Sequence, residues 1–166
     1  RGLGSTVALM ALAARLLMAA LQSTGGLLLL AGVTAATFLP PTGSSGEDVA
    51  ALAVALHDGS VAVWEPFFAV HCVAVGTLLG RAPAVPRPLG VLLACAGAGY
   101  AAHGLGSLLW PGAAPALEAL AAVLAVGGEV PFVVWLVARG NAAPSRDGGA
   151  LSRSRAQRSR DHAGAP

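Results

Sequence analysis

Residues 113–138 read AAPALEALAAVLAVGGEVPFVVWLVA, a stretch without Lys, Arg or Asp. A helix needs about 20 mainly apolar residues to cross the hydrocarbon core of a bilayer. It also satisfies its own backbone polar groups, as any segment surrounded by lipid must. The stretch therefore predicts a transmembrane helix.

Three further stretches have the same character, at about residues 5–38, 60–80 and 89–110. The first is too long for one straight crossing and contains Arg15. The loop Ala82-Pro83-Ala84-Val85-Pro86-Arg87-Pro88 is a firm break, because proline cannot supply the backbone donors of a helix. We predict an all-α fold, a polytopic membrane helical bundle with four transmembrane helices.

The composition supports a multi-pass protein of the cell membrane. The 166 residues have a mean hydropathy of +0.71 and 11% charged residues, against about 25% in soluble domains. The lack of Lys and the abundance of Ala and Gly suggest a bacterial source rich in GC. Because the chain begins with Arg1, we expect that upstream helices are missing. Cys72 and Cys95 lie in apolar runs and indicate inert buried thiols.

A short amphipathic helix is predicted at about residues 47–57, between the first two spans. Ser44 and Glu47 fit a capping box. Val49, Leu52 and Leu56 are among the apolar residues that then recur at helical spacing. The alternative is that this segment extends the second span.

Arginine positions predict the orientation. Short cytoplasmic loops collect basic residues, so Arg81 and Arg87 place their loop in the cytoplasm. Arg139 and the tail at 141–166 follow two crossings later on the same side. The tail has almost no large apolar residues, which predicts a disordered, Arg-rich cytoplasmic segment. Its arginines are expected to face the bilayer surface and to attract anionic lipid.

Ionisable residues within spans are costly and are candidate functional residues. His71 and Glu129 each lie ten residues from a predicted cytoplasmic end, or about 15 Å deep, and Arg15 is expected about 12 Å deep. We predict a buried ion pair between Arg15 and Glu129 with His71 nearby, although Arg15 alone could snorkel to the interface. A second layer is expected at Glu65 and His103.

Small residues predict where the helices touch, because lipid offers no hydrophobic driving force and close backbone contact takes its place. Pro66 and Pro131 lie inside spans, where each leaves a helix carbonyl without its usual donor. The predicted packing positions are Gly76, Gly80, Gly97, Gly99 and Gly104.

Catalytic and cofactor signals are weak. The sequence contains no phosphate-binding loop, dinucleotide fingerprint or nucleophile elbow. We therefore predict no catalytic residue, no metal site, no cofactor and no nucleic-acid partner. Haem ligation by His71 and His103 and an intramembrane enzyme remain minor alternatives, because ligands for a metal cluster are few.

The order of several short motifs resembles a family of bacterial multi-pass membrane proteins catalogued as a domain of unknown function, number 4386. The resemblance covers about residues 57–140 and extends more loosely to Arg15-Leu16-Leu17. It implies about six spans, so that two upstream helices would be absent, and it implies that His71 and Glu129 belong to the family pattern. It implies no activity. The motifs that carry it are His57-Asp58-Gly59, Phe67-Phe68-Ala69-Val70-His71-Cys72, Pro86-Arg87-Pro88-Leu89-Gly90, Gly97-Ala98-Gly99-Tyr100, Leu109-Trp110-Pro111, Gly128-Glu129 and Trp135-Leu136-Val137-Ala138-Arg139-Gly140.

These observations together predict an integral membrane protein of unknown biochemical activity. We expect a structural or interaction bundle with a buried polar layer. The alternative is a component of a small-molecule or proton-coupled transporter or of a channel, in which the polar layer would form the site.

Overall fold

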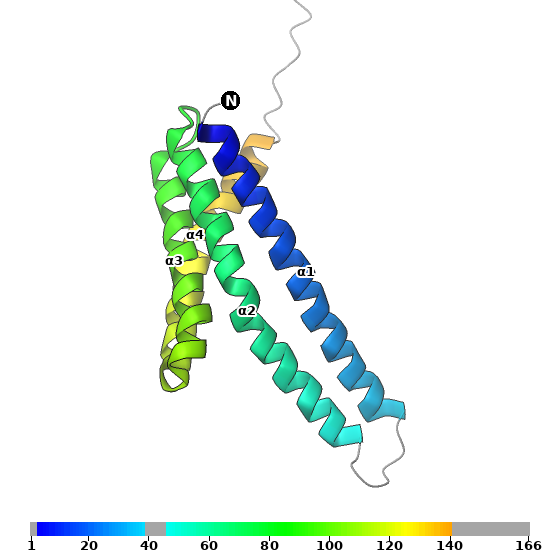
Figure 1. Ribbon diagram of the computed structural model, residues 1–166. Coiled ribbons are helices and arrows are strands. Elements are labelled where there is room, and N and C mark those ends of the chain that lie inside the picture. The colour runs from blue at the N-terminus through cyan, green and yellow to red at the C-terminus, as the bar shows by residue number, and fades with distance from the viewer. Residues whose placement is uncertain (1–2, 39–45, 141–166) are drawn as a thin grey trace, which may run out of the picture. The chain divides into compact units, whose positions relative to one another are not determined.

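The structure, a computed structural model, describes residues 3–38 and 46–140, and these contain helices and no strand (Figure 1). Four helices are long and apolar enough to cross a bilayer. The predicted all-α fold with four membrane-spanning helices is therefore confirmed. The elements are α1 (Leu3–Phe38), α2 (Gly46–Arg81), α3 (Arg87–Leu109), the 3-10 helix η1 (Pro111–Ala113) and α4 (Ala114–Gly140).

The separate amphipathic helix predicted at residues 47–57 is wrong, because it and the second span form the single 36-residue helix α2. An interior glycine costs a helix only about 1 kcal/mol, and contacts with α1 on both sides of Gly59 offset that cost. His57 Nδ1 donates to the Gly25 carbonyl at 3.0 Å, and Ser60 also packs against Gly25. The alternative of an extended second span is the correct one.

Some predictions fall outside the described residues. Ser44 of the predicted capping box lies in the segment 39–45, and the predicted disordered tail occupies 141–166. The described residues divide into two units at the boundary between residues 133 and 134. The described part of the second unit is the end of α4, with Trp135 and Arg139.

Consecutive helices of the first unit pack through rows of mostly small residues at seven-residue spacing. On α1 the buried residues Ala11, Met18, Gly25 and Gly32 form one such row. On α3, one row faces α2 and a second faces α4. This spacing is typical of left-handed helix packing. The α3 rows are Gly90, Gly97 and Gly104 toward α2, and Gly99 and Gly106 toward α4.

The two internal prolines lie within continuous helices. Pro66 cannot donate to the Ala62 carbonyl, and Gly104 of α3 packs at this point. A Cβ added at Gly104 would lie 2.9 Å from the Ala62 oxygen and 2.8 Å from Pro66 Cδ. Glycine therefore lets the α3 backbone approach the carbonyl that Pro66 leaves without a donor.

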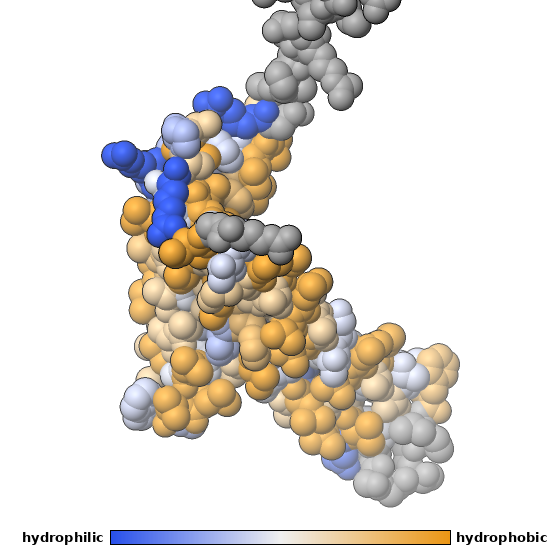
Figure 2. All heavy atoms as spheres, turned by 45° about the horizontal axis from the view of Figure 1, so that its top comes forward, coloured by the Kyte–Doolittle hydropathy of each residue, from blue (hydrophilic) through white to orange (hydrophobic). Residues whose placement is uncertain are grey.

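The core between the helices is small. It consists of Met18, Phe68, Cys72 and Leu93, with Tyr100, Phe132 and other partly buried side chains packed around it. Most large apolar side chains point outward instead, and Val123, for example, is 71% exposed. Figure 2 shows the result as a mainly hydrophobic outer surface, the arrangement expected of helices surrounded by lipid.

Exposed hydroxyl groups on these helices form hydrogen bonds with carbonyls of their own helix. Ser23, Thr24, Thr34, Thr37 and Thr77 each donate to the carbonyl one turn earlier, at 2.8–3.0 Å. Such a bond keeps a hydroxyl paired where no water is present. These side chains can therefore face lipid without an unpaired donor.

Candidate functional site: polar side chains at membrane depth

Phe68 of α2 lies at the centre of a group of aromatic and polar side chains from several helices. The Arg15 guanidinium carbon of α1 lies 5.1 Å from the centre of the Phe68 ring. The His71 ring stacks on Phe68 at 5.8 Å, and the Tyr100 ring of α3 meets Phe68 edge-on at 4.9 Å. We call Arg15, Phe68, His71, Tyr100 and Glu129 the aromatic–polar cluster.

Glu129 of α4 completes this cluster through a hydrogen bond. Tyr100 Oη donates to Glu129 Oε1 at 2.6 Å, and both side chains are partly buried. A short bond from a hydroxyl to a carboxylate is among the stronger hydrogen bonds in proteins. Glu129 therefore has a partner on the neighbouring helix α3.

The predicted ion pair between Arg15 and Glu129 is wrong, since no such contact occurs within the described residues. Both charges act electrostatically on the thiol of Cys72, which lies in the core. Arg15 faces outward along the Phe68 ring, whose electron-rich face attracts a cation. The two charges thus lie in the same region, but each has a different direct partner.

His71 joins α2 to α1. Its Nδ1 lies 2.9 Å from the Ala11 carbonyl oxygen and donates to it. In a continuous helix that carbonyl already accepts a bond from within α1, and a carbonyl has two lone pairs to offer. The histidine thereby ties two helices together without a charged partner.

Glu65 and His103 form a second polar contact, between α2 and α3. His103 Nδ1 lies 2.6 Å from Glu65 Oε2. Glu65 is only 5% exposed, so an unpaired carboxylate there would be costly. Glu118 of α4 adds a second negative charge that acts on Glu65. The imidazole of His103 acts in the opposite direction and favours the ionised carboxylate.

The structure thus brings the five predicted polar residues into two separate arrangements. Arg15, His71 and Glu129 belong to the aromatic–polar cluster, whereas Glu65 and His103 pair with each other. No group of three or more His, Cys, Asp or Glu side chains within residues 3–38 and 46–140 is placed to hold a metal ion. His71 and His103 contact different helices through their Nδ1 atoms.

Sequence reasoning missed Phe68, Tyr100 and His57. Tyr100 is the single tyrosine of the chain and lies within a span, and a phenol at that depth needs an acceptor. That signal could have identified it. Phe68 could not be distinguished from Phe67 without knowing which face of α2 is buried.

The predicted packing glycines have unequal surroundings. A Cβ added at Gly76 would lie 2.5 Å from the Gly90 oxygen, and one at Gly97 would lie 2.8 Å from the Ala69 oxygen. Gly99 packs against α4 and Gly104 against α2 in the same close manner. A Cβ at Gly80 would meet nothing within 4 Å.

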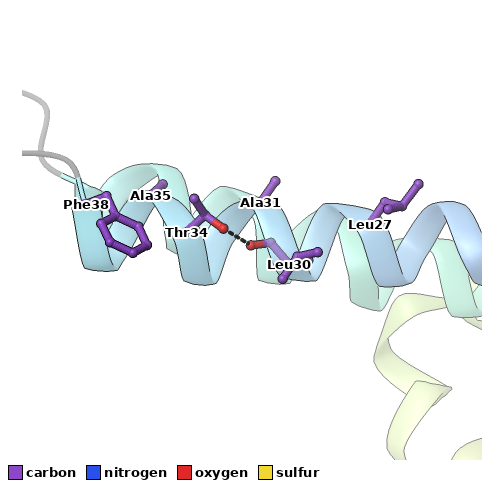
Figure 3. Close-up of a pocket in the computed structure, with 6 residues that line it drawn as sticks. All are labelled: Leu27, Leu30, Ala31, Thr34, Ala35 and Phe38. Carbon is purple, nitrogen blue, oxygen red and sulfur yellow. Dashed lines mark hydrogen bonds between the residues drawn. The ribbon is translucent and has the colours of Figure 1, made fainter.

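Two apolar grooves occur on the outside of the helices. One, of about 490 Å³, lies along α1 (Figure 3), where Thr34 Oγ1 donates to the Leu30 carbonyl at 2.9 Å. The other, of about 560 Å³, lies between α3 and α4 near Trp110. Neither offers an ionisable side chain. The first is lined by Leu27, Leu30, Ala31, Thr34, Ala35 and Phe38.

Comparison with known proteins completes this description. No curated protein and no solved structure matches the chain. The model of one protein family, described as "Domain of unknown function (DUF4386)", matches residues 1–140. This match includes every residue of the aromatic–polar cluster and confirms the resemblance noted from the sequence motifs. The chain therefore belongs to the DUF4386 family of domains of unknown function.

Proposed function

We propose that this protein is a membrane-embedded interaction scaffold, in which polar side chains fix the order and register of the helices. One observation carries the proposal: a polar contact joins each helix to the next. His71 joins α2 to α1, the Glu65–His103 pair joins α3 to α2, and the Tyr100–Glu129 bond joins α4 to α3.

The geometry of these contacts favours a scaffold over a conduction path. A transport site needs polar groups that are free to exchange partners with a substrate or with water. Here the carboxylates of Glu65 and Glu129 are each engaged at 2.6 Å by a side chain of a neighbouring helix. Such contacts between helices contribute about 0.6 kcal/mol on average in membrane proteins, and up to about 1.7 kcal/mol.

The proposal includes an orientation in the cell membrane. The turn between α2 and α3, with Arg81 and Arg87, would face the cytoplasm, as would the C-terminal tail. Basic residues near membrane ends favour that side. The surrounding bilayer would be the principal partner, with anionic lipid attracted by the tail arginines.

The test measures stability and proton flux on the same variants. Glu129→Gln is expected to lower the thermal stability of the purified protein in detergent. The reason is that a neutral amide oxygen accepts a weaker hydrogen bond from Tyr100 than a carboxylate does. Proton flux into reconstituted vesicles, followed with an internal pH dye, should equal that of protein-free vesicles for both wild type and variant. Asp58→Asn removes an exposed carboxylate of α2 and serves as the control.

A specific flux would overturn the proposal. If wild-type vesicles conduct protons, and Glu129→Gln abolishes this conduction while the variant remains folded, then the cluster is a transport site. The transporter alternative would replace the scaffold in that case. Lowered stability without any flux, with Asp58→Asn unchanged, supports the scaffold.

A further inference from the structure

A basic pocket lies at the turn that joins α2 to α3. It has a volume of about 400 Å³, and both arginines of the turn contribute to its wall. In contrast to the apolar grooves on α1 and between α3 and α4, it presents cationic side chains. Its lining residues are Gly80, Arg81, Ala82, Pro83, Val85 and Arg87.

The turn is held in a defined conformation. The Ala82 N–H donates to the Leu79 carbonyl at 3.0 Å, and the Val85 N–H donates to the Ala82 carbonyl at 3.1 Å. Pro83 and Pro86 fix two further backbone angles. A ligand at this turn would therefore not have to order the backbone, which lowers the entropic cost of binding.

The two helices pack closely beside the pocket. A Cβ added at Gly90 would lie 2.5 Å from the Gly76 oxygen and 2.9 Å from the Gly80 nitrogen. The last turn of α2 and the first turn of α3 are thus in backbone contact. This contact sets the distance between the segments that carry Arg81 and Arg87.

The pocket has no internal counter-charge. Neither Arg81 nor Arg87 forms an ion pair with an acidic side chain in the part of the chain that the structure describes. Arg87 is also the first residue of α3, where a backbone N–H has no acceptor within the helix and the helix dipole favours an anion. Two arginines and no acidic residue line the pocket, so its lining has a net positive charge.

We propose that this pocket binds a phosphate group, either the headgroup phosphate of an anionic phospholipid or a soluble phosphate ester. One guanidinium group can donate two parallel hydrogen bonds to two oxygens of a phosphate. The pocket also lies where two membrane-spanning helices end, which is the depth at which lipid headgroups lie. This binding function goes beyond the proposed scaffold and does not depend on it.

The test measures lipid binding to the full-length chain in detergent by native mass spectrometry. The probes are phosphatidic acid, phosphatidylglycerol and phosphatidylcholine. Arg81→Gln and Arg87→Gln should each lower the apparent affinity for the two anionic lipids about fivefold. The double variant should lower it about 25-fold, and binding of phosphatidylcholine should change little.

Arg139→Gln is the matched control, because it removes one basic side chain from the last turn of α4 and does not line the pocket. The tail arginines are present in every variant, so their contribution cancels. Arg87→Lys keeps the charge but removes the planar fork, and it should retain part of the affinity. Folding of each variant is checked by thermal unfolding in the same detergent.

The arms of the experiment distinguish the source of the phosphate. Selective loss of phosphatidic acid and phosphatidylglycerol binding in the pocket variants assigns the site to lipid. Binding of inorganic phosphate to lipid-free protein, with the same dependence on Arg81 and Arg87, assigns it to a soluble phosphate ester. Equal losses in the pocket variants and Arg139→Gln, or no loss in any of them, would overturn the proposal.

Discussion

Gly76 and Gly80 of α2 provide a sharp test of the packing, because they look equivalent in sequence and differ in the structure. They are separated by one helical turn in a small-xxx-small pattern. A Cβ added at Gly76 would lie 2.5 Å from the Gly90 oxygen and 3.1 Å from the Ala94 nitrogen, whereas one at Gly80 would meet nothing within 4 Å. We expect Gly76→Ala to destabilise the bundle and Gly80→Ala to stabilise it.

The magnitude follows from two opposing effects. Alanine inside a helix is favoured over glycine by about 0.5–1 kcal/mol, and both variants gain this term. A normal carbon–oxygen contact is about 3.3 Å, so the new Cβ at Gly76 is roughly 0.8 Å too close to a backbone oxygen. Overpacking of this kind costs about 1–3 kcal/mol. The net loss of unfolding free energy for Gly76→Ala is therefore about 0–2.5 kcal/mol, with a midpoint of roughly 1.2 kcal/mol.

Cys72 provides the assay, because its side chain is 1% exposed and lies one turn before Gly76. The prediction of a buried thiol is wrong for Cys95, which is exposed because it faces away from the neighbouring helices. In a Cys95→Ser background, a maleimide should label Cys72 only when the helices separate. If labelling is proportional to the open population, it should be about 8-fold faster in Gly76→Ala at the midpoint of this range, and up to about 70-fold faster at its upper end. In Gly80→Ala it should be slower than in the parent. Equal labelling rates in the two alanine variants would refute the close contact between α2 and α3.

Three further substitutions test the polar contacts by unfolding in detergent. Tyr100→Phe should cost about 0.6–1.7 kcal/mol, and in combination with Glu129→Gln it should cost less than the sum of the two, whereas additive losses would show that these side chains do not interact. His103→Ala should cost about 3–5 kcal/mol because it leaves the carboxylate of Glu65 buried and unpaired, and the double variant His103→Leu with Glu65→Leu should recover most of this loss; a stable His103→Ala would contradict the pairing. Arg15→Ala should cost about 1–2 kcal/mol and Arg15→Lys less, since both cations can lie over an aromatic ring, and equal losses would rule out the cation–ring contact.

Span positions were predictable from sequence because they depend on composition summed over about 20 residues. The third predicted span, at about 89–110, corresponds closely to α3 at Arg87–Leu109. The joining of residues 47–57 to the second span was not predictable, because it depends on His57 and Ser60 packing against Gly25 in a distant part of the chain. The residues next to His57 and Ser60 in the sequence do not indicate that Gly25 is their contact.

The partners of the polar residues were harder to predict than their depth. Depth follows from counting residues, but a partner depends on the rotation of each helix about its axis. Arg15 lies over the Phe68 ring, whereas Glu129 accepts a hydrogen bond from Tyr100. The rotation of α3, set by the alternate glycine rows that face α2 and α4, places Tyr100 beside Glu129.

The linking of each helix to its predecessor has a consequence for biosynthesis, in which helices leave the insertion machinery in chain order. His71 meets the Ala11 carbonyl as soon as α2 enters the bilayer, and Glu129 enters to find Tyr100 already present. Glu65 enters one helix earlier than its partner His103. A nascent chain halted after α2 would therefore hold the carboxyl group of Glu65 in lipid without its His103 partner, which is costly.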